Sequence, residues 1–138
     1  MQAVQVEHYI RRATDFLRGM HLMRGDESYL NSSALLAIHS AVSYSDALRT
    51  GLGETKLSAD DHTATVDTLR QVLLSKRYKD DSGLKFLREL LSKKNLVAYG
   101  NKGFSDYQTL INRAEQFAKW SNKVGSQLKI EGWRDANE

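Results

Sequence analysis

The stretch LNSSALLAIHSAVSYSDALRTG, residues 30–51, decides the fold because it combines a helical apolar pattern with small side chains. Its apolar positions recur at the spacing of one helical face and are Leu35, Ile38, Val42 and Leu48. Small residues fill many of the other positions, namely Ala34, Ala37, Ser40, Ala41, Ser43 and Ala47. Small side chains let a second backbone approach closely, so we expect the central helix of a bundle. Asn31 or Ser32 is the expected N-cap, and Gly51 the expected end.

Four further segments carry helical periodicity, and none reads convincingly as a β-strand. The first helix is expected over residues 2–23, and the third lies within residues 54–77. The fourth is expected as one continuous helix over residues 83–99, ended by Gly100. The fifth has the clearest apolar pattern, over residues 107–128. The candidate N-caps of the last three helices are Ser58 or Asp60, Asp81 or Ser82, and Ser105 or Asp106.

The chain as a whole favours one all-helical domain over residues 1–138. This length suffices for a single core, and the sequence contains no proline, which breaks helix interiors. Short connections between long helices imply antiparallel neighbours. We therefore expect an all-α, up-and-down antiparallel bundle of four long helices plus a shorter fifth helix. Residues 129–138 are expected to form a loosely ordered tail, in which Ile130 and Trp133 are able to dock on the bundle.

Composition excludes several kinds of site. The chain has no cysteine, so thiolate metal sites, disulfides and a cysteine nucleophile are excluded. Its four histidines are dispersed, so we expect no metal site and no cofactor. A net charge of +3 permits an anionic partner such as RNA without requiring one. No apolar run is long enough to span a bilayer and the first residues lack a signal-peptide core, so we expect a cytoplasmic protein without a membrane partner.

Three polar residues near the end of the fourth expected helix do not fit its apolar face. On a helical wheel, Lys94 falls inside the apolar arc, and Asn95 and Tyr99 stack at the edge of that arc. A charge at a core-facing position costs free energy unless it is paired or reaches water. One interpretation is that the Lys94 stem extends to solvent near the helix end. The other is that Lys94, Asn95 and Tyr99 line a shared polar cleft.

The expected second helix carries two residues that suit such a cleft. His39 and Asp46 lie seven positions apart, at the edge of the apolar stripe. Seven residues make about two helical turns, so both side chains lie on the same side of the helix. We predict that Asp46 or His39 is the partner of Lys94, which makes these three the candidate binding residues. The alternative for His39 is a half-buried histidine without a functional role.

The sequence resembles HEPN domains in three respects: the order of its helices, the small side chains of residues 29–48, and this polar motif. Many members of that family are metal-independent ribonucleases, whose signature is an arginine, a polar residue, three variable positions and a histidine. In this sequence that register falls on Lys94, Asn95, residues 96–98 and Tyr99. The resemblance therefore implies Lys94, Asn95 and Tyr99 as the catalytic positions, with no metal and no cofactor. A tyrosine at the last position is similar to what a large bacterial subset of HEPN-like domains carries.

The two positions on which the chemistry most depends differ from the nuclease signature. Lys94 keeps the positive charge but lacks the two-pronged grip of arginine on phosphate. Tyr99 is a poor base at neutral pH, because an unperturbed tyrosine has a pKa of about 10. We therefore expect binding of RNA or nucleotide phosphate with little or no nuclease activity. His39 is a further candidate base from the neighbouring helix.

The resemblance also implies partners. HEPN domains commonly pair with their motifs facing each other, which here predicts a homodimer with a basic, tyrosine-lined groove for single-stranded RNA. It further implies a toxin–antitoxin or defence setting, with an antitoxin or a nucleotidyltransferase as the partner protein. Two alternatives remain open. One is a helical protein–protein interaction module whose polar motif is structural, and the other is a metal-independent endoribonuclease with a variant motif.

Overall fold

The computed structural model describes residues 2–53, 62–98 and 106–135. Within these residues every regular element is a helix, which confirms the prediction of an all-α protein. The elements in chain order are α1 (Gln2–Met23), the short 3-10 helix η1 (Glu27–Tyr29), α2 (Leu30–Gly51), α3 (His62–Ser75), α4 (Gly83–Ser92), α5 (Lys94–Ala98) and α6 (Tyr107–Gln127). None of the described helices is long and apolar enough to cross a membrane.

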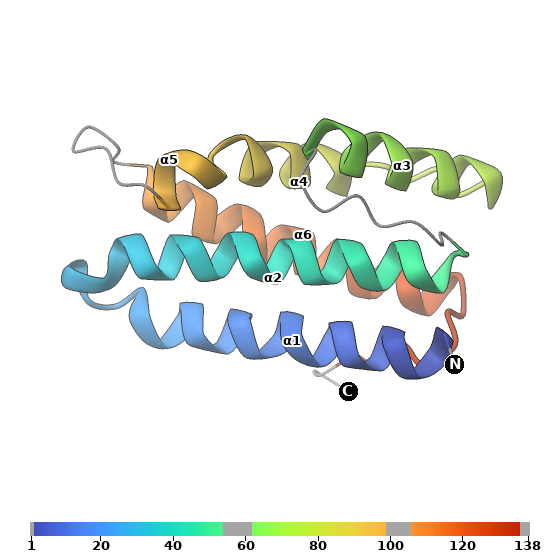
Figure 1. The fold of residues 1–138 in the computed structure, drawn as a ribbon, viewed down its shortest axis with the longest axis horizontal. Coiled ribbons are helices and arrows are strands. Elements are labelled where there is room, and N and C mark those ends of the chain that lie inside the picture. Colours follow the sequence, from blue (N-terminus) through green and yellow to red (C-terminus); the bar gives the residue numbers. More distant parts are fainter. Residues whose placement is uncertain (1, 54–61, 99–105, 136–138) are drawn as a thin grey trace.

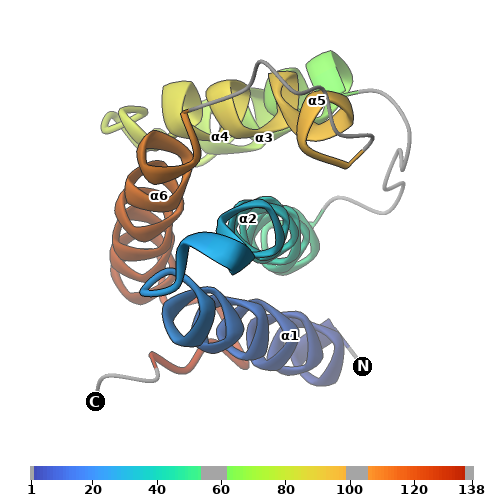
Figure 2. The same cartoon turned by 90° about the vertical axis from the view of Figure 1, so that its left-hand side faces the viewer.

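Helix α2 lies at the centre of the described structure, as its small side chains predict. It contacts each of the other described α-helices. Figure 1 shows α1 along one side of α2 and the shorter helices α3, α4 and α5 along the opposite side. In the end-on view of Figure 2, α6 closes a third side and joins the two layers. The buried core therefore surrounds α2 on three sides.

Two buried serines of α2 fix its alignment with α1. Ser33 Oγ donates a hydrogen bond to the Met20 carbonyl oxygen at 2.9 Å, and Ser40 Oγ donates to the Ala13 carbonyl oxygen at 2.8 Å. The two bonds follow opposite orders along the two helices, so α1 and α2 are antiparallel. A hydroxyl that bonds to the neighbouring helix avoids the cost of an unsatisfied buried polar group. The serines thus give both close packing and a defined register.

The expected continuous helix over residues 83–99 is instead two helices. Lys93 leaves the helical backbone, with φ −102° and ψ 0°, and its amide bonds back to the carbonyls of Leu90 and Leu91. Lys94 then begins α5. The described structure therefore has three long helices, of 22, 22 and 21 residues, where four are expected. Because the helix breaks before Lys94, Lys94 does not lie on the same helical wheel as the residues of α4. Its expected place within the apolar arc is therefore not valid.

The expected side-chain caps are absent from the described helix starts. The N-cap of α2 is Tyr29, and η1 leads directly into the helix, so Asn31 and Ser32 already lie inside it. Ser82 and Asp106 do occupy the N-cap positions of α4 and α6, but neither makes a side-chain capping bond. The remaining expected boundary residues, Ser58, Asp60, Gly100 and Ser105, lie outside the described residues.

Two tryptophans each lie against a glycine of a helix. The Trp120 ring covers Gly83 at the start of α4, and the Trp133 ring covers Gly125 of α6. A β-carbon at either glycine would overlap the indole ring, so both contacts require glycine. Ile130 is also buried. Ile130 and Trp133 therefore dock on the helices, whereas Lys129, Glu131 and Arg134 are exposed.

Candidate functional site

One side of α2 is only half-buried. Four residues at helical spacing form this side, which we call the α2 stripe: Leu35, His39, Val42 and Asp46. The stripe has polar neighbours on two other helices, because both Arg12 of α1 and Lys94 of α5 affect the pKa of His39. Side chains from α1 and α5, which are far apart in the sequence, therefore both act on this side of α2.

His39 is the centre of this group. Its ring lies 5.3 Å from the ring of Phe16, centroid to centroid, at an interplanar angle of 33°. Burial lowers the pKa of His39 below its usual value, and the positive charges of Lys94 and Arg12 lower it further. The imidazole is therefore neutral at pH 7, and one of its nitrogens is able to accept a proton or a hydrogen bond.

Neither of the two cations that act on His39 forms an ion pair with a described carboxylate, although Arg12 also acts electrostatically on Asp46. Lys94 is half-buried and Arg12 is exposed. Neither side chain lies within 4 Å of a carboxylate among the described residues. Positive charges that act on one neutral side chain raise the local potential and favour the approach of an anion. The group is therefore suited to hold a phosphate or a carboxylate.

Asp46, at the other end of the α2 stripe, interacts with a different cation. Its carboxylate lies 3.9 Å from the guanidinium of Arg49, which is only 1% exposed. Burial raises the pKa of Asp46 to about 6, and the charges of Arg49 and Arg12 only partly oppose this effect. Of the two partners expected for Lys94, His39 is the one whose pKa Lys94 lowers. Asp46 forms its ion pair with Arg49.

The catalytic positions implied by the HEPN resemblance are only partly described. Lys94 and Asn95 are the first two residues of α5, and Asn95 is exposed. Tyr99, the third position, lies outside the described residues. The part of the chain that is described brings together no three His, Asp or Glu side chains able to hold a metal ion.

Sequence reasoning missed Arg12 and Phe16 as members of this group. They lie four residues apart and so share one face of α1. The bond from Ser40 to the Ala13 carbonyl brings this part of α1 next to the middle of α2, where it meets His39. The i, i+4 spacing is visible in the sequence, but the register between the two helices is not.

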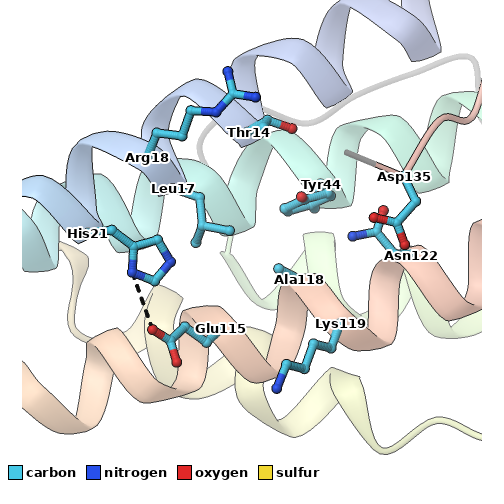
Figure 3. Close-up of a pocket in the computed structure, with 10 residues that line it drawn as sticks. All are labelled: Thr14, Leu17, Arg18, His21, Tyr44, Glu115, Ala118, Lys119, Asn122 and Asp135. Carbon is cyan, nitrogen blue, oxygen red and sulfur yellow. Dashed lines mark ion pairs between the residues drawn. The ribbon is translucent and has the colours of Figure 1, made fainter. Parts of the chain in front are cut away.

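A second site, also missed by sequence reasoning, is a cavity of about 370 Å³ between α1 and α6 (Figure 3). Tyr44 of α2 lies between the two walls, and the side chains of Thr14 and Asn122 line the cavity with it. Burial raises the pKa of Tyr44, so its phenol stays protonated at neutral pH. Trp133 stacks on Tyr44 and donates a hydrogen bond to Asn122 Oδ1 at 3.0 Å. The C-terminal segment therefore helps to build this cavity.

The charges that line this cavity are mixed in sign. Glu115 forms an ion pair with Arg24. Its carboxylate also lies 3.5 Å from His21 Nδ1 (Figure 3). Arg18 and Lys119 add positive charge, and Asp135 adds negative charge. A balanced lining gives no preference for an anion. The group around His39 is therefore the better candidate for a phosphate ligand.

No model of a known protein family matches the sequence, and no curated protein or solved structure shows detectable similarity to it. The HEPN resemblance accordingly stays a prediction that depends on the motif and the helix order.

Proposed function

We propose that the chain is a HEPN-like helical protein that binds the phosphate of RNA or of a nucleotide beside the α2 stripe. The observation that supports this proposal is that Lys94 and Arg12, from two different helices, both act electrostatically on His39. Neither cation has a carboxylate within 4 Å among the described residues, although Arg12 also acts on Asp46, and the imidazole on which both cations act is neutral. An anionic phosphate supplies the missing negative charge. The single carboxylate of the stripe, Asp46, is paired with Arg49.

The contact between Phe16 and His39 favours RNA over a simple inorganic anion. The two rings form a half-buried aromatic surface next to the cations. Proteins that bind single-stranded RNA combine positive charge along the backbone with aromatic rings on which bases stack. The proposed ligand is therefore a single-stranded segment, with a phosphate at Lys94 and Arg12 and a base beside Phe16.

The proposed assembly is a homodimer in which two α2 stripes face each other. Leu35 and Val42 give the stripe apolar surface that a second copy would cover. Multi-angle light scattering of the purified protein tests this part, and a monomer at micromolar concentration would refute it. An antitoxin or nucleotidyltransferase partner in a bacterial toxin–antitoxin system is part of the same proposal. A neighbouring nucleotidyltransferase gene would support it.

A second candidate function, metal-independent RNA cleavage, is favoured by the lowered pKa of His39. A neutral imidazole is able to take the proton of a ribose 2′-hydroxyl, and Lys94 is able to stabilise the charge that develops on the phosphate. Incubation of labelled RNA with an excess of protein and a chelator tests this function. Cleavage that is lost in His39→Ala supports it, and intact RNA rules it out.

RNA binding is tested by fluorescence anisotropy with a labelled oligouridylate, at low and at physiological salt. Lys94→Met should weaken binding and reduce the salt-dependence slope by about 0.7, the value for one lost phosphate contact on a single strand. The matched control is Lys93→Met, because Lys93 is an adjacent exposed lysine that does not affect His39. No measurable binding, or equal binding by both variants, would favour the interaction module instead.

A further inference from the structure

Helix α3 ends in a turn that holds an arginine in a left-handed backbone conformation. The Tyr78 amide donates to the Leu73 carbonyl and the Arg77 amide to the Leu74 carbonyl, each at 3.0 Å. This pair of bonds is a Schellman motif, in which the residue after the helix end is usually glycine. Arg77 occupies that position with φ 56°. A side chain here has a conformational cost that glycine avoids.

Arg77 lines a groove of about 480 Å³ between the end of α3 and the start of α4. Leu73 and Leu84 form a buried apolar floor, and Leu74, which is 62% exposed, lies at its edge. Sites for small molecules are typically about 300–1,000 Å³ in volume and mostly apolar. We call this site the α3–α4 groove.

The rim of the α3–α4 groove carries more positive than negative charge. Arg70, Arg77 and Lys79 line it, together with one carboxylate, Asp81. Arg70 is paired with Asp67 at 3.3 Å. Arg77 and Lys79 have no carboxylate within 4 Å among the described residues. Two cations are therefore available beside an apolar floor.

The α3–α4 groove offers few oriented hydrogen-bonding groups besides these charges. The hydroxyl of Tyr78, which also lines it, is already bonded to Gln127 Oε1 at 2.6 Å. A sugar or a nucleobase needs several fixed donors and acceptors, whereas an alkyl chain needs only apolar surface. The lining therefore suits a molecule with an apolar chain and an anionic end.

We propose that the α3–α4 groove binds a small, soluble anionic amphiphile, such as a medium-chain carboxylate. The carboxylate lies between Arg77 and Lys79, and the chain lies on Leu73, Leu74 and Leu84. A groove of about 480 Å³ falls within the volume range of small-molecule sites, so we expect a small molecule as its occupant. The site shares no residue with the α2 stripe, and its test is independent of RNA binding.

The probe is decanoate, used below its micelle concentration and measured by isothermal titration calorimetry on the full chain. Decanol and decylamine have the same chain with a neutral or a cationic end. We expect saturable binding of decanoate and weaker binding of decanol, by about tenfold for the loss of the charged contacts. Decylamine should not bind. Equal affinity for decanoate and decanol would overturn the proposal.

The decisive variant is Arg77→Gly, which removes the charge and suits the left-handed backbone. It should weaken decanoate binding about tenfold. Lys129→Gly is the matched control, because Lys129 has φ 52° in the same motif at the end of α6 and does not line the groove. Unchanged binding by Arg77→Gly, equal losses in both variants, or binding only to anionic vesicles would each refute the site.

Discussion

Lys94 lowers the pKa of His39, which couples the first residue of α5 to the middle of α2 electrostatically. The two residues lie on different helices, and the packing of α5 on α2 brings those helices together. A coupling of this kind is measurable without knowledge of the ligand. It therefore allows the geometry of the candidate site to be tested before its function.

Replacement of Lys94 by methionine should raise the pKa of His39 toward its usual value. One of the two cations that disfavour the imidazolium is then gone, while burial and Arg12 continue to lower the pKa. Titration of the His39 ring protons by NMR measures the effect, with Lys93→Met as the control. Binding of a phosphate ligand should also raise the pKa of His39. An identical titration in Lys94→Met and wild type would show that the two side chains are not close.

The half-buried carboxyl of Asp46 should make the protein less stable as the pH rises from about 4 to about 6. Its folded-state pKa, about 6, lies above the ordinary value of 3.8, so the native state binds more protons than the unfolded state in this window. Stability then falls with rising pH, by at most about 3 kcal/mol for a shift of this size. Asp46→Asn removes the titrating group. The free energy of unfolding of the variant should therefore rise relative to that of wild type as the pH rises across this window. Urea unfolding at several pH values measures this difference, and a constant difference would contradict the prediction.

The contact between Gly83 and Trp120 should make the start of α4 intolerant of any side chain. A methyl group at residue 83 would overlap the indole, whose Nε1 is held by a hydrogen bond to the Asp80 carbonyl oxygen at 3.0 Å. We expect Gly83→Ala to lower the free energy of unfolding by about 1–3 kcal/mol, the usual cost of overpacking. Gly25→Ala is the control, because nothing lies within 4 Å of a β-carbon there. Equal stability of the two variants would show that the Trp120 ring is free to move.

The periodicity of the sequence predicted α1 with its observed bounds. It also predicted that α4 begins after Ser82 and α6 after Asp106. It was insufficient for the break at Lys93. Neither glycine nor proline stands there, and lysine has a high helix propensity, so nothing local announces the end of α4. The break separates the buried leucines of α4 from the buried Val97 of α5, and it therefore depends on packing against other helices.

The candidate site shows the same division between local and long-range information. His39 and Lys94 stand out in the sequence because a polar residue at the edge of an apolar face needs an explanation. Arg12 and Phe16 do not stand out, because they are ordinary residues of an amphipathic helix. Only the alignment of α1 with α2, set by the bonds of Ser33 and Ser40 to α1 carbonyls, brings them to His39.

Replacement of Arg77 by glycine should leave the protein as stable as wild type or more stable by up to about 1.6 kcal/mol. In the folded state, glycine removes the cost of the left-handed conformation, about 1–2 kcal/mol. In the unfolded state, glycine gives the chain more conformational freedom, which lowers the stability of the variant by about 0.4–1 kcal/mol. Lys129→Gly should behave in the same way, because Lys129 has nearly the same φ. Thermal and urea unfolding measure both variants. Stability kept in both, together with decanoate binding lost only in Arg77→Gly, would show that the Arg77 side chain serves the α3–α4 groove rather than the fold. A clear loss of stability in Arg77→Gly alone would instead assign that side chain a structural role.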